Sequence, residues 1–235
     1  MGWWKFDGDA NDVSGNGKNG SLNNFLGNPW SNGLLDDALS FNGFDDYLSI
    51  PGSETTGSAF DLTNAVSVTA WAKPSAVAVG GEWILAGKAS YTFSTNYALT
   101  MAAIANGTTS AYFYGGYSGT GQGFCGLNGP GGVNTWHFVG GSRGSSGSNT
   151  QLHCQLDGQQ GAVVNQRTLS SNNDPVKIGV GYSLGNPTYF PGSLDDLILY
   201  NKTLDSAGLC NAYLASCYST DPSFGIDCDA SCVGD

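Results

Sequence analysis

Carboxylate and amide side chains crowd the segment that follows the first aromatic residues, WKFDGDANDVSGNGKNGSL at 4–22. Its candidate oxygen donors are Asp7, Asp9, Asp12 and Asn16. The glycines between them disfavour a helix, and so polar a stretch buries little apolar surface. These oxygens therefore either make Asx turns in a solvated loop or are directed at a ligand.

Aromatic side chains recur in SAYFYGGYSG at 110–119, with the alternation of a β-strand. If Ala111 and Phe113 face a core, Tyr112 and Tyr114 point to the opposite face of the same strand. Flat exposed rings cover the apolar C–H faces of sugars, whereas the alternative is cross-strand packing with no ligand. Other aromatic residues lie beside glycine or proline, as in loop edges. The candidate ligand-contacting residues are Tyr112, Tyr114, Tyr117, Trp83 and Tyr189.

A catalytic arrangement is hard to find. A retaining glycosidase needs two carboxyl groups about 5 Å apart, but the two glutamates, Glu54 and Glu82, fall in distant segments. Neighbouring aspartates such as Asp195 and Asp196 should point to opposite faces of a strand. The two histidines, His137 and His153, lie in separate segments without lyase motifs, and His137 is interpreted as structural. We therefore expect a protein that is not an enzyme, with a hydrolase or lyase of unrecognised site as an alternative.

The formal net charge of −11 disfavours nucleic acid and anionic membranes as partners, because few cations are present to neutralise phosphates. No apolar run approaches the roughly 20 residues that cross a bilayer. Met1-Gly2 runs directly into Trp3, which we interpret as a trimmed mature domain behind an added start codon. A monomer, or one part of a larger multidomain protein, is expected.

The cysteines are even in number and lack the spacing of a zinc site: Cys125, Cys154, Cys210, Cys217, Cys228 and Cys232. Disulfides in an exported protein are the better interpretation. Cys210 and Cys217 lie two helical turns apart, roughly 10 Å, which is too far for one bridge. Each should pair with Cys228 or Cys232, in an order left open, and Cys125–Cys154 then remains as a cross-strand bridge.

Short apolar runs separated by glycine-rich turns predict an all-β protein, a two-sheet antiparallel jelly roll with one short helix over 204–216. The jelly-roll domain should span 1–216, and a disulfide-stapled tail, 217–235, should pack on it. The segments TWHFVGGSRG and TQLHCQLDGQ should form a hairpin. The other predicted strands are 37–42, 46–50, 65–73, 82–88, 96–103, 109–115, 176–181 and 193–201.

Five of these pieces occur in the order of a known family: WKFDGDANDVSGNGKNGSL, ALSFNGFDDYLSIP, VSVTAWAKPS, TWHFVGGSRGSSGSNTQLHCQLDGQ and FPGSLDDLILYNKTLDSAGLCNAYL. Together they resemble the laminin-G-like, concanavalin-A-like jelly-roll domains of bacterial extracellular proteins, over residues 3–216. The chain departs from the pattern in three places. Gly208 replaces an acidic residue of the terminal helix, Cys154 lies in the hairpin, and the cysteine-rich tail is extra.

The resemblance implies one structural calcium ion near the chain ends, where the first and last strands lie side by side. Calcium takes six to eight oxygen ligands, and the implied donors are Asp7, Asp12, Asn16, Asp195 and Asp196. Turn formation without metal remains the alternative. For function, we expect a non-catalytic carbohydrate-binding module, secreted or at the cell surface, that recognises a neutral or weakly charged glycan. An adhesion module that binds a protein partner is the second possibility.

Overall fold

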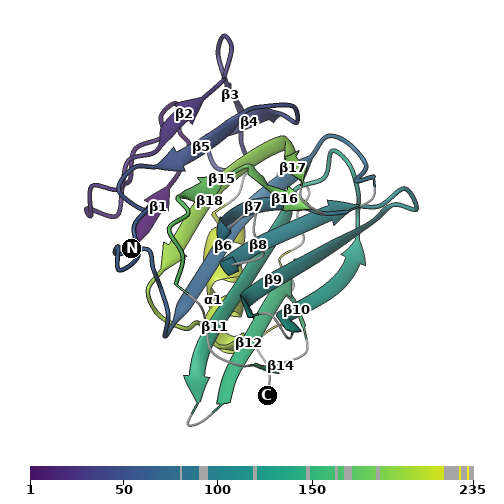
Figure 1. Ribbon diagram of the computed structural model, residues 1–235. Helices are drawn as coiled ribbons and strands as arrows, with labels where there is room; N and C mark the ends of the chain where they lie inside the picture. The colour runs from purple at the N-terminus through teal and green to yellow at the C-terminus, as the bar shows by residue number, and fades with distance from the viewer. Residues whose placement is uncertain are drawn as a thin grey trace.

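The computed structural model describes residues 1–79, 81–89, 95–118, 121–146, 149–161, 164–166, 171–183, 186–219, 228 and 232. Two antiparallel sheets face each other, and one helix follows the last strand (Figure 1). The predicted all-β jelly roll with a short C-terminal helix is therefore confirmed.

The first sheet has nine strands, ordered β13-β12-β11-β6-β18-β4-β3, with β1 beside β18 and β14 beside β12. The first and last strands are neighbours as expected, since Trp3 pairs with Ile198. The strands are β1 (Gly2–Trp4), β3 (Trp30–Asn32), β4 (Asp37–Asn42), β6 (Val66–Pro74), β11 (His137–Ser146), β12 (Asn149–Leu156), β13 (Gln159–Gln160), β14 (Val164–Gln166) and β18 (Pro191–Tyr200).

The second sheet has seven strands in the order β10-β9-β8-β7-β15-β5-β2. The strands are β2 (Ser21–Asn23), β5 (Tyr47–Ile50), β7 (Trp83–Ala89), β8 (Thr95–Ala103), β9 (Thr108–Ser118), β10 (Gly121–Pro130) and β15 (Val176–Ile178). A separate hairpin, β16 (Val180–Ser183) with β17 (Asn186–Tyr189), packs near β7. Gly179, at φ +81°, divides the single strand predicted over 176–181 into β15 and β16.

The main core fills the space between the sheets. Val139 and Leu199 enter it from the nine-stranded sheet, and Leu48 and Phe113 enter it from the seven-stranded sheet. Each of these residues is at most 1% exposed. Alternation along each strand therefore leaves a second, outward face on both sheets.

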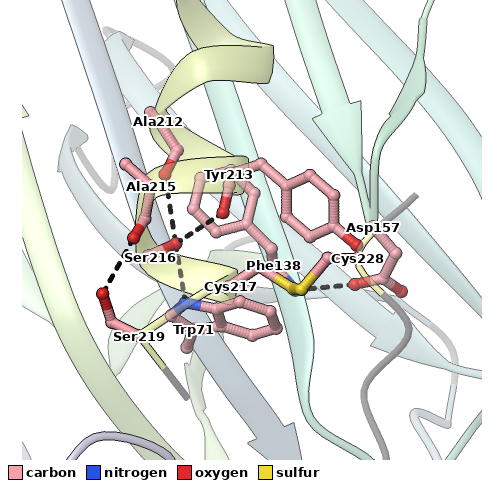
Figure 2. The surroundings of a disulfide bond; sticks show 10 residues. All are labelled: Trp71, Phe138, Asp157, Ala212, Tyr213, Ala215, Ser216, Cys217, Ser219 and Cys228. Carbon is pink, nitrogen blue, oxygen red and sulfur yellow. Dashed lines mark hydrogen bonds between the residues drawn. A yellow bond between two sulfur atoms is a disulfide. The ribbon is translucent and has the colours of Figure 1, made fainter. Parts of the chain in front are cut away.

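Helix α1 (Ser206–Cys217) covers the outward face of the nine-stranded sheet. Asp205 caps its N-terminus by accepting a hydrogen bond from the Gly208 amide at 2.8 Å. Rings of Trp71 and Phe138 from the sheet pack against Tyr213, with centroids 6.1 and 5.4 Å from that ring (Figure 2). These residues form a second apolar cluster, so the helix covers the part of this face around Trp71 and Phe138.

Three disulfides are formed. Cys210 pairs with Cys232 and Cys217 pairs with Cys228, so the tail is tied to α1 at two points, as predicted. The third joins Cys125 of β10 to Cys154 of β12. These strands belong to different sheets, so the bond expected between neighbouring strands instead crosses the sandwich. In the described part of the chain, no helix is long and apolar enough to span a membrane.

Candidate functional site

The outward face of the seven-stranded sheet is built by β8, β9 and β10. Ala111 and Phe113 point into the core, which places Tyr112 and Tyr114 on the outward face, as the alternation predicted. The pairing brings Thr100 opposite Tyr112. On the other side of β9, Phe124 of β10 lies opposite Tyr114. Three aromatic residues thus share one surface.

The three rings form a compact cluster, which we call the aromatic face: Tyr112, Tyr114 and Phe124. The ring centroids of Tyr112 and Tyr114 are 6.3 Å apart, and Phe124 lies 6.0 Å from the first and 5.8 Å from the second. The Phe124 side chain is 47% exposed, and both tyrosines are half-buried. Such a cluster offers apolar ring surface to solvent.

Gly126 determines how the Tyr112 ring lies. A Cβ atom on Gly126 would come within 2.3 Å of Tyr112 Cδ1 and 2.6 Å of Cε1. The ring therefore rests directly over the backbone of β10, where any larger residue would displace it. The arrangement of the aromatic face therefore requires glycine at position 126.

Glu82 lies beside this cluster, just before β7. One carboxylate oxygen accepts a hydrogen bond from the Tyr114 hydroxyl, and the other accepts one from the Thr100 hydroxyl. Burial raises the pKa of Glu82, and the two hydroxyl hydrogen bonds oppose that rise. Burial, together with the negative charge of Glu82, raises the pKa of Tyr114, so its phenol remains a donor. The carboxylate is therefore held in a fixed position.

These groups surround a cavity of about 390 Å³. The cavity can hold a ligand that packs an apolar surface against the aromatic rings on one side and donates hydrogen bonds to Glu82 on the other. The lining residues are Ala78, Gly81, Glu82, Ala102, Ile104, Ser110, Tyr112, Tyr114 and Phe124.

The other predicted ligand contacts do not join this site. Trp83 is only 9% exposed and packs in the core against Phe190, with centroids 5.9 Å apart, so a role in ligand stacking is corrected to a packing role. Tyr189 is half-buried in the β16–β17 hairpin, opposite Val180, and does not line the cavity. The side chain of Tyr117 lies outside the described residues.

Two site residues were missed by the sequence reasoning, Phe124 and Glu82. The strand β10 was not predicted, because its glycines and terminal proline are typical of a loop. An inward-facing Cys125 was the available signal, since its neighbour Phe124 must then point outward. No pattern in the sequence links Glu82 to Tyr114, which is 32 residues away.

At the chain start, the structure shows turn chemistry at two predicted calcium ligands. Asp12 Oδ1 accepts the amides of Trp3 and Ser14 at 3.0 and 2.9 Å, and Oδ2 accepts that of Lys18 at 2.9 Å. Burial would raise the pKa of Asp12, but these hydrogen bonds lower it below its ordinary value. Asn16 is exposed and donates to Ser14 Oγ at 2.9 Å. Both side chains therefore order the loop through hydrogen bonds within the protein, which is the turn chemistry given as the alternative to calcium.

Asp195 and Asp196 lie on the same face of β18, contrary to the expected alternation. Leu194 and Leu197 are both completely buried in the core, because a bulge between Asp195 and Ile198, with Asp196 at φ +47°, inserts one residue. Asp195 Oδ2 accepts the amides of Leu34 and Leu35 at 2.8 and 2.9 Å. Asp196 Oδ1 accepts the indole N–H of Trp3 at 2.6 Å. The predicted opposite orientation was wrong.

The carboxyl of Asp195 is completely buried, and its Oδ1 has no hydrogen-bond partner. Burial raises its pKa to about 8, and the charges of Asp196 and Asp7 add to the rise. Oxygen donors of this kind fit a hard cation. However, the described residues contain no group of three or more His, Cys, Asp or Glu side chains arranged to hold a metal ion. Calcium therefore stays a prediction, restricted to Asp7, Asp195 and Asp196.

A second cavity, of about 940 Å³, lies on the outward face of the nine-stranded sheet, between α1 and the strands β1 and β18. Asp196, Trp3, Trp71 and Tyr200 are among its walls. The indole N–H of Trp71 donates to Ser216 Oγ at 3.1 Å (Figure 2), and that of Trp3 donates to Asp196. The indole N–H groups of Trp3 and Trp71, which line this cavity, therefore already have hydrogen-bond partners within the protein.

His137 has a structural environment. It is 1% exposed, its Nδ1 lies 2.6 Å from Asp157 Oδ2, and its Nε2 lies 3.2 Å from Thr109 Oγ1. The Asp157 carboxylate also accepts the Phe138 amide at 2.7 Å. The ring thus joins β11 to the turn after β12.

Solved structures with this fold include both binding domains and enzymes. Domain 4 of AbnA, an extracellular arabinanase from Geobacillus stearothermophilus solved in complex with arabinotriose, has a TM-score of 0.59 and 17% identity over 88% of this chain and 95% of its own. A Trypanosoma rangeli sialidase mutant with trans-sialidase activity has a TM-score of 0.63 and 15% identity over 94% of this chain. The match covers 33% of the sialidase chain.

The binding domain of botulinum neurotoxin serotype D has a TM-score of 0.50 and 14% identity, over 87% of this chain and 49% of that one. A search of curated proteins finds no match. The family model described as the concanavalin A-like lectin/glucanases superfamily matches residues 41–210. The chain belongs to the concanavalin A-like lectin/glucanase superfamily.

Proposed function

We propose that this protein is a non-catalytic carbohydrate-binding module of a secreted or cell-surface protein, and that it binds a glycan at the aromatic face. The observation that carries the proposal is the cluster of Tyr112, Tyr114 and Phe124 beside the fixed carboxylate of Glu82. The arabinanase domain solved with arabinotriose supports it at the level of the fold.

The chemistry of the face suits a sugar. The partly exposed ring of Phe124 and the Tyr112 ring can cover the C–H face of a pyranose or furanose unit. Glu82 can accept hydrogen bonds from hydroxyl groups at the edge of the cavity. The three disulfides are typical of proteins exported to an oxidising environment, which agrees with an extracellular location.

The non-catalytic part of the proposal rests on the carboxylates. The cavity lining contains one acidic residue, Glu82, and the other glutamate, Glu54, is an exposed residue outside this lining. Double displacement at a sugar carbon requires a second carboxyl group about 5 Å away. A single half-buried carboxylate that accepts two hydroxyl hydrogen bonds supports binding.

The test is affinity electrophoresis against a panel of polysaccharides, with chain length of each glycan monitored after incubation. Tyr112→Ala and Phe124→Ala should abolish retardation in the gel. Phe44→Ala is the matched control, because Phe44 is 83% exposed in the loop between β4 and β5. Unchanged binding by both site variants would place the glycan elsewhere and contradict the proposal. Shortened glycans would contradict its non-catalytic part.

A second candidate, adhesion to a protein partner, is favoured by one surface. Leu26 and Phe44 are 93% and 83% exposed. Their loops are neighbours, because Asn24 Nδ2 donates to the Asp45 carbonyl at 2.9 Å. Exposed apolar side chains on adjoining loops are a feature of protein-binding surfaces. If this role dominates, Leu26→Ser combined with Phe44→Ser should abolish attachment to the partner and leave glycan retardation unchanged.

We also propose a structural calcium ion at Asp7, Asp195 and Asp196. The buried, unpartnered Asp195 Oδ1 and the repulsion among these carboxylates support it. Calcium would relieve that repulsion and join β1 to β18. Added Ca²⁺ should raise the thermal midpoint relative to chelator, and Asp195→Asn should remove the difference. Equal midpoints with Ca²⁺ and with chelator in the unmodified protein would contradict the site.

A further inference from the structure

Among the residues that the structure describes, Glu82 is the one charged side chain in the lining of the 390 Å³ cavity. Its carboxylate is half-buried, and the donors that it receives are neutral hydroxyls from Thr100 and Tyr114. Hydroxyl donors fix the position of the carboxylate but do not neutralise its charge. The described residues of the lining include no lysine, arginine or histidine that could do so.

Three aromatic rings adjoin this charge. The centroids of Tyr112, Tyr114 and Phe124 lie 5.8 to 6.3 Å from one another. Ring faces carry negative electrostatic potential and attract a cation placed within about 6 Å of the centroid. A cation above this cluster could therefore interact with more than one ring and with Glu82 together. Aromatic rings recognise quaternary ammonium groups in this way, and a carboxylate adds a charge-assisted hydrogen bond to an ammonium group that carries protons.

The charge of the whole molecule acts in the same direction. A formal net charge of −11 attracts cationic ligands over the range of the Debye length. A neutral sugar would leave the charge of Glu82 uncompensated in a partly desolvated cavity, whereas an ammonium group would compensate it.

We infer that the glycan recognised at the aromatic face carries protonated amino groups, so that its sugar units are amino sugars with free amines. This inference rests on the proposed carbohydrate-binding function. The ammonium group would occupy the cavity against Glu82, and the rings would cover the adjoining sugar face. Binding by this arrangement distinguishes an amine from both a hydroxyl and an acetamido group at the same carbon.

The experiment compares three β-1,4-linked glucose-type oligomers of equal length that carry hydroxyl, acetamido or amino groups at C2. Isothermal titration calorimetry would be performed at about pH 6.5 and physiological ionic strength, which screens distant charges but not a contact pair. We expect the amino oligomer to bind roughly tenfold more tightly than the other two, as one hydrogen-bonded charge pair allows.

Two variants locate the preference. Glu82→Gln retains the size and an acceptor oxygen, and should lose roughly tenfold in affinity for the amino oligomer. Glu54→Gln is the matched control, because it removes the same charge from an exposed loop and should change affinity less than twofold. Phe124→Leu removes an exposed ring, is expected to fold, and should weaken amino-oligomer binding severalfold.

The possible outcomes separate this inference from the proposed function. Preference for the hydroxyl or acetamido oligomer, abolished by Phe124→Leu, would overturn the amine requirement and leave carbohydrate binding at the aromatic face intact. Equal losses in Glu82→Gln and Glu54→Gln would show diffuse attraction to an acidic surface and overturn the inference. If no oligomer or polysaccharide bound, both proposals would fail.

Discussion

Replacement of Gly126 by alanine tests whether a ring lying flat on the sheet creates the binding surface. The added Cβ would lie 2.3 Å from Tyr112 Cδ1, so the ring must leave its place over β10. The Tyr112 ring would then lose its edge contact with Phe124, at 6.0 Å between ring centroids, and its tilted contact with Tyr114, at 6.3 Å. Aromatic contacts of this kind contribute about 0.5–1.5 kcal/mol each.

Two effects on stability oppose each other in this variant. The two lost ring contacts destabilise the folded state by about 1–3 kcal/mol, and alanine stabilises a strand interior relative to glycine by about 0.5–1 kcal/mol. The free energy of unfolding should therefore fall by at most about 2.5 kcal/mol. Glycan affinity should nevertheless fall roughly tenfold, because the stacking surface is displaced.

The assay combines urea unfolding, followed by tryptophan fluorescence, with affinity electrophoresis on the glycan identified for the unmodified protein. Gly132→Ala serves as the matched control, because its Cβ would meet no described atom closer than 3.4 Å at Gly107 Cα. Undiminished glycan retardation by Gly126→Ala would refute the argument. Unfolding of the variant in the absence of urea would also refute it, because lost glycan binding would then reflect loss of the fold.

Three further outcomes are expected. Because burial raises the pKa of Glu82, the folded state holds this proton more tightly than the unfolded state. The free energy of unfolding should therefore fall as pH rises from the ordinary glutamate pKa toward the raised one, and Glu82→Gln should flatten that slope in urea titrations. A Cys125→Ser, Cys154→Ser double variant opens a bridge with a sequence separation of 29 and should lose about 3–4 kcal/mol, measured by denaturant midpoint; an unchanged midpoint would contradict this. His137→Ala should lower the thermal midpoint and leave glycan binding intact, whereas selective loss of binding would give His137 a functional role.

The features that could be predicted from the sequence are those determined by local geometry, such as the alternation of side chains along a strand. Tyr112 and Tyr114 could be placed on the outward face because they alternate along the strand with the apolar residues Ala111 and Phe113, which face the core. Helix geometry gave the bonding of the tail to α1 at two points, since two turns separate Cys210 from Cys217, but it left open which tail cysteine pairs with which. Periodicity of two and a fixed helical rise suffice for such conclusions.

The parts that failed depend on irregular backbone or on distant segments. The bulge in β18 reversed the expected orientation of Asp195 and Asp196, and no residue type marks a bulge in advance. Trp83 was expected at a loop edge because glycines precede it, but the strand begins there and turns its ring inward. Glu82 meets Tyr114 only through the pairing of β7, β8 and β9, which tertiary structure alone determines.

The two outward faces of the sandwich are unequal, and this has a practical consequence for presenting the protein on a surface. Strand β1 belongs to the nine-stranded sheet, and Cys228 and Cys232 are bonded to the helix on that sheet's outward side. Both ends of the described chain therefore belong to the layer opposite the aromatic face (Figure 1). Coupling a bead, sensor chip or fusion partner through either end should leave Tyr112 and Phe124 directed toward the solution.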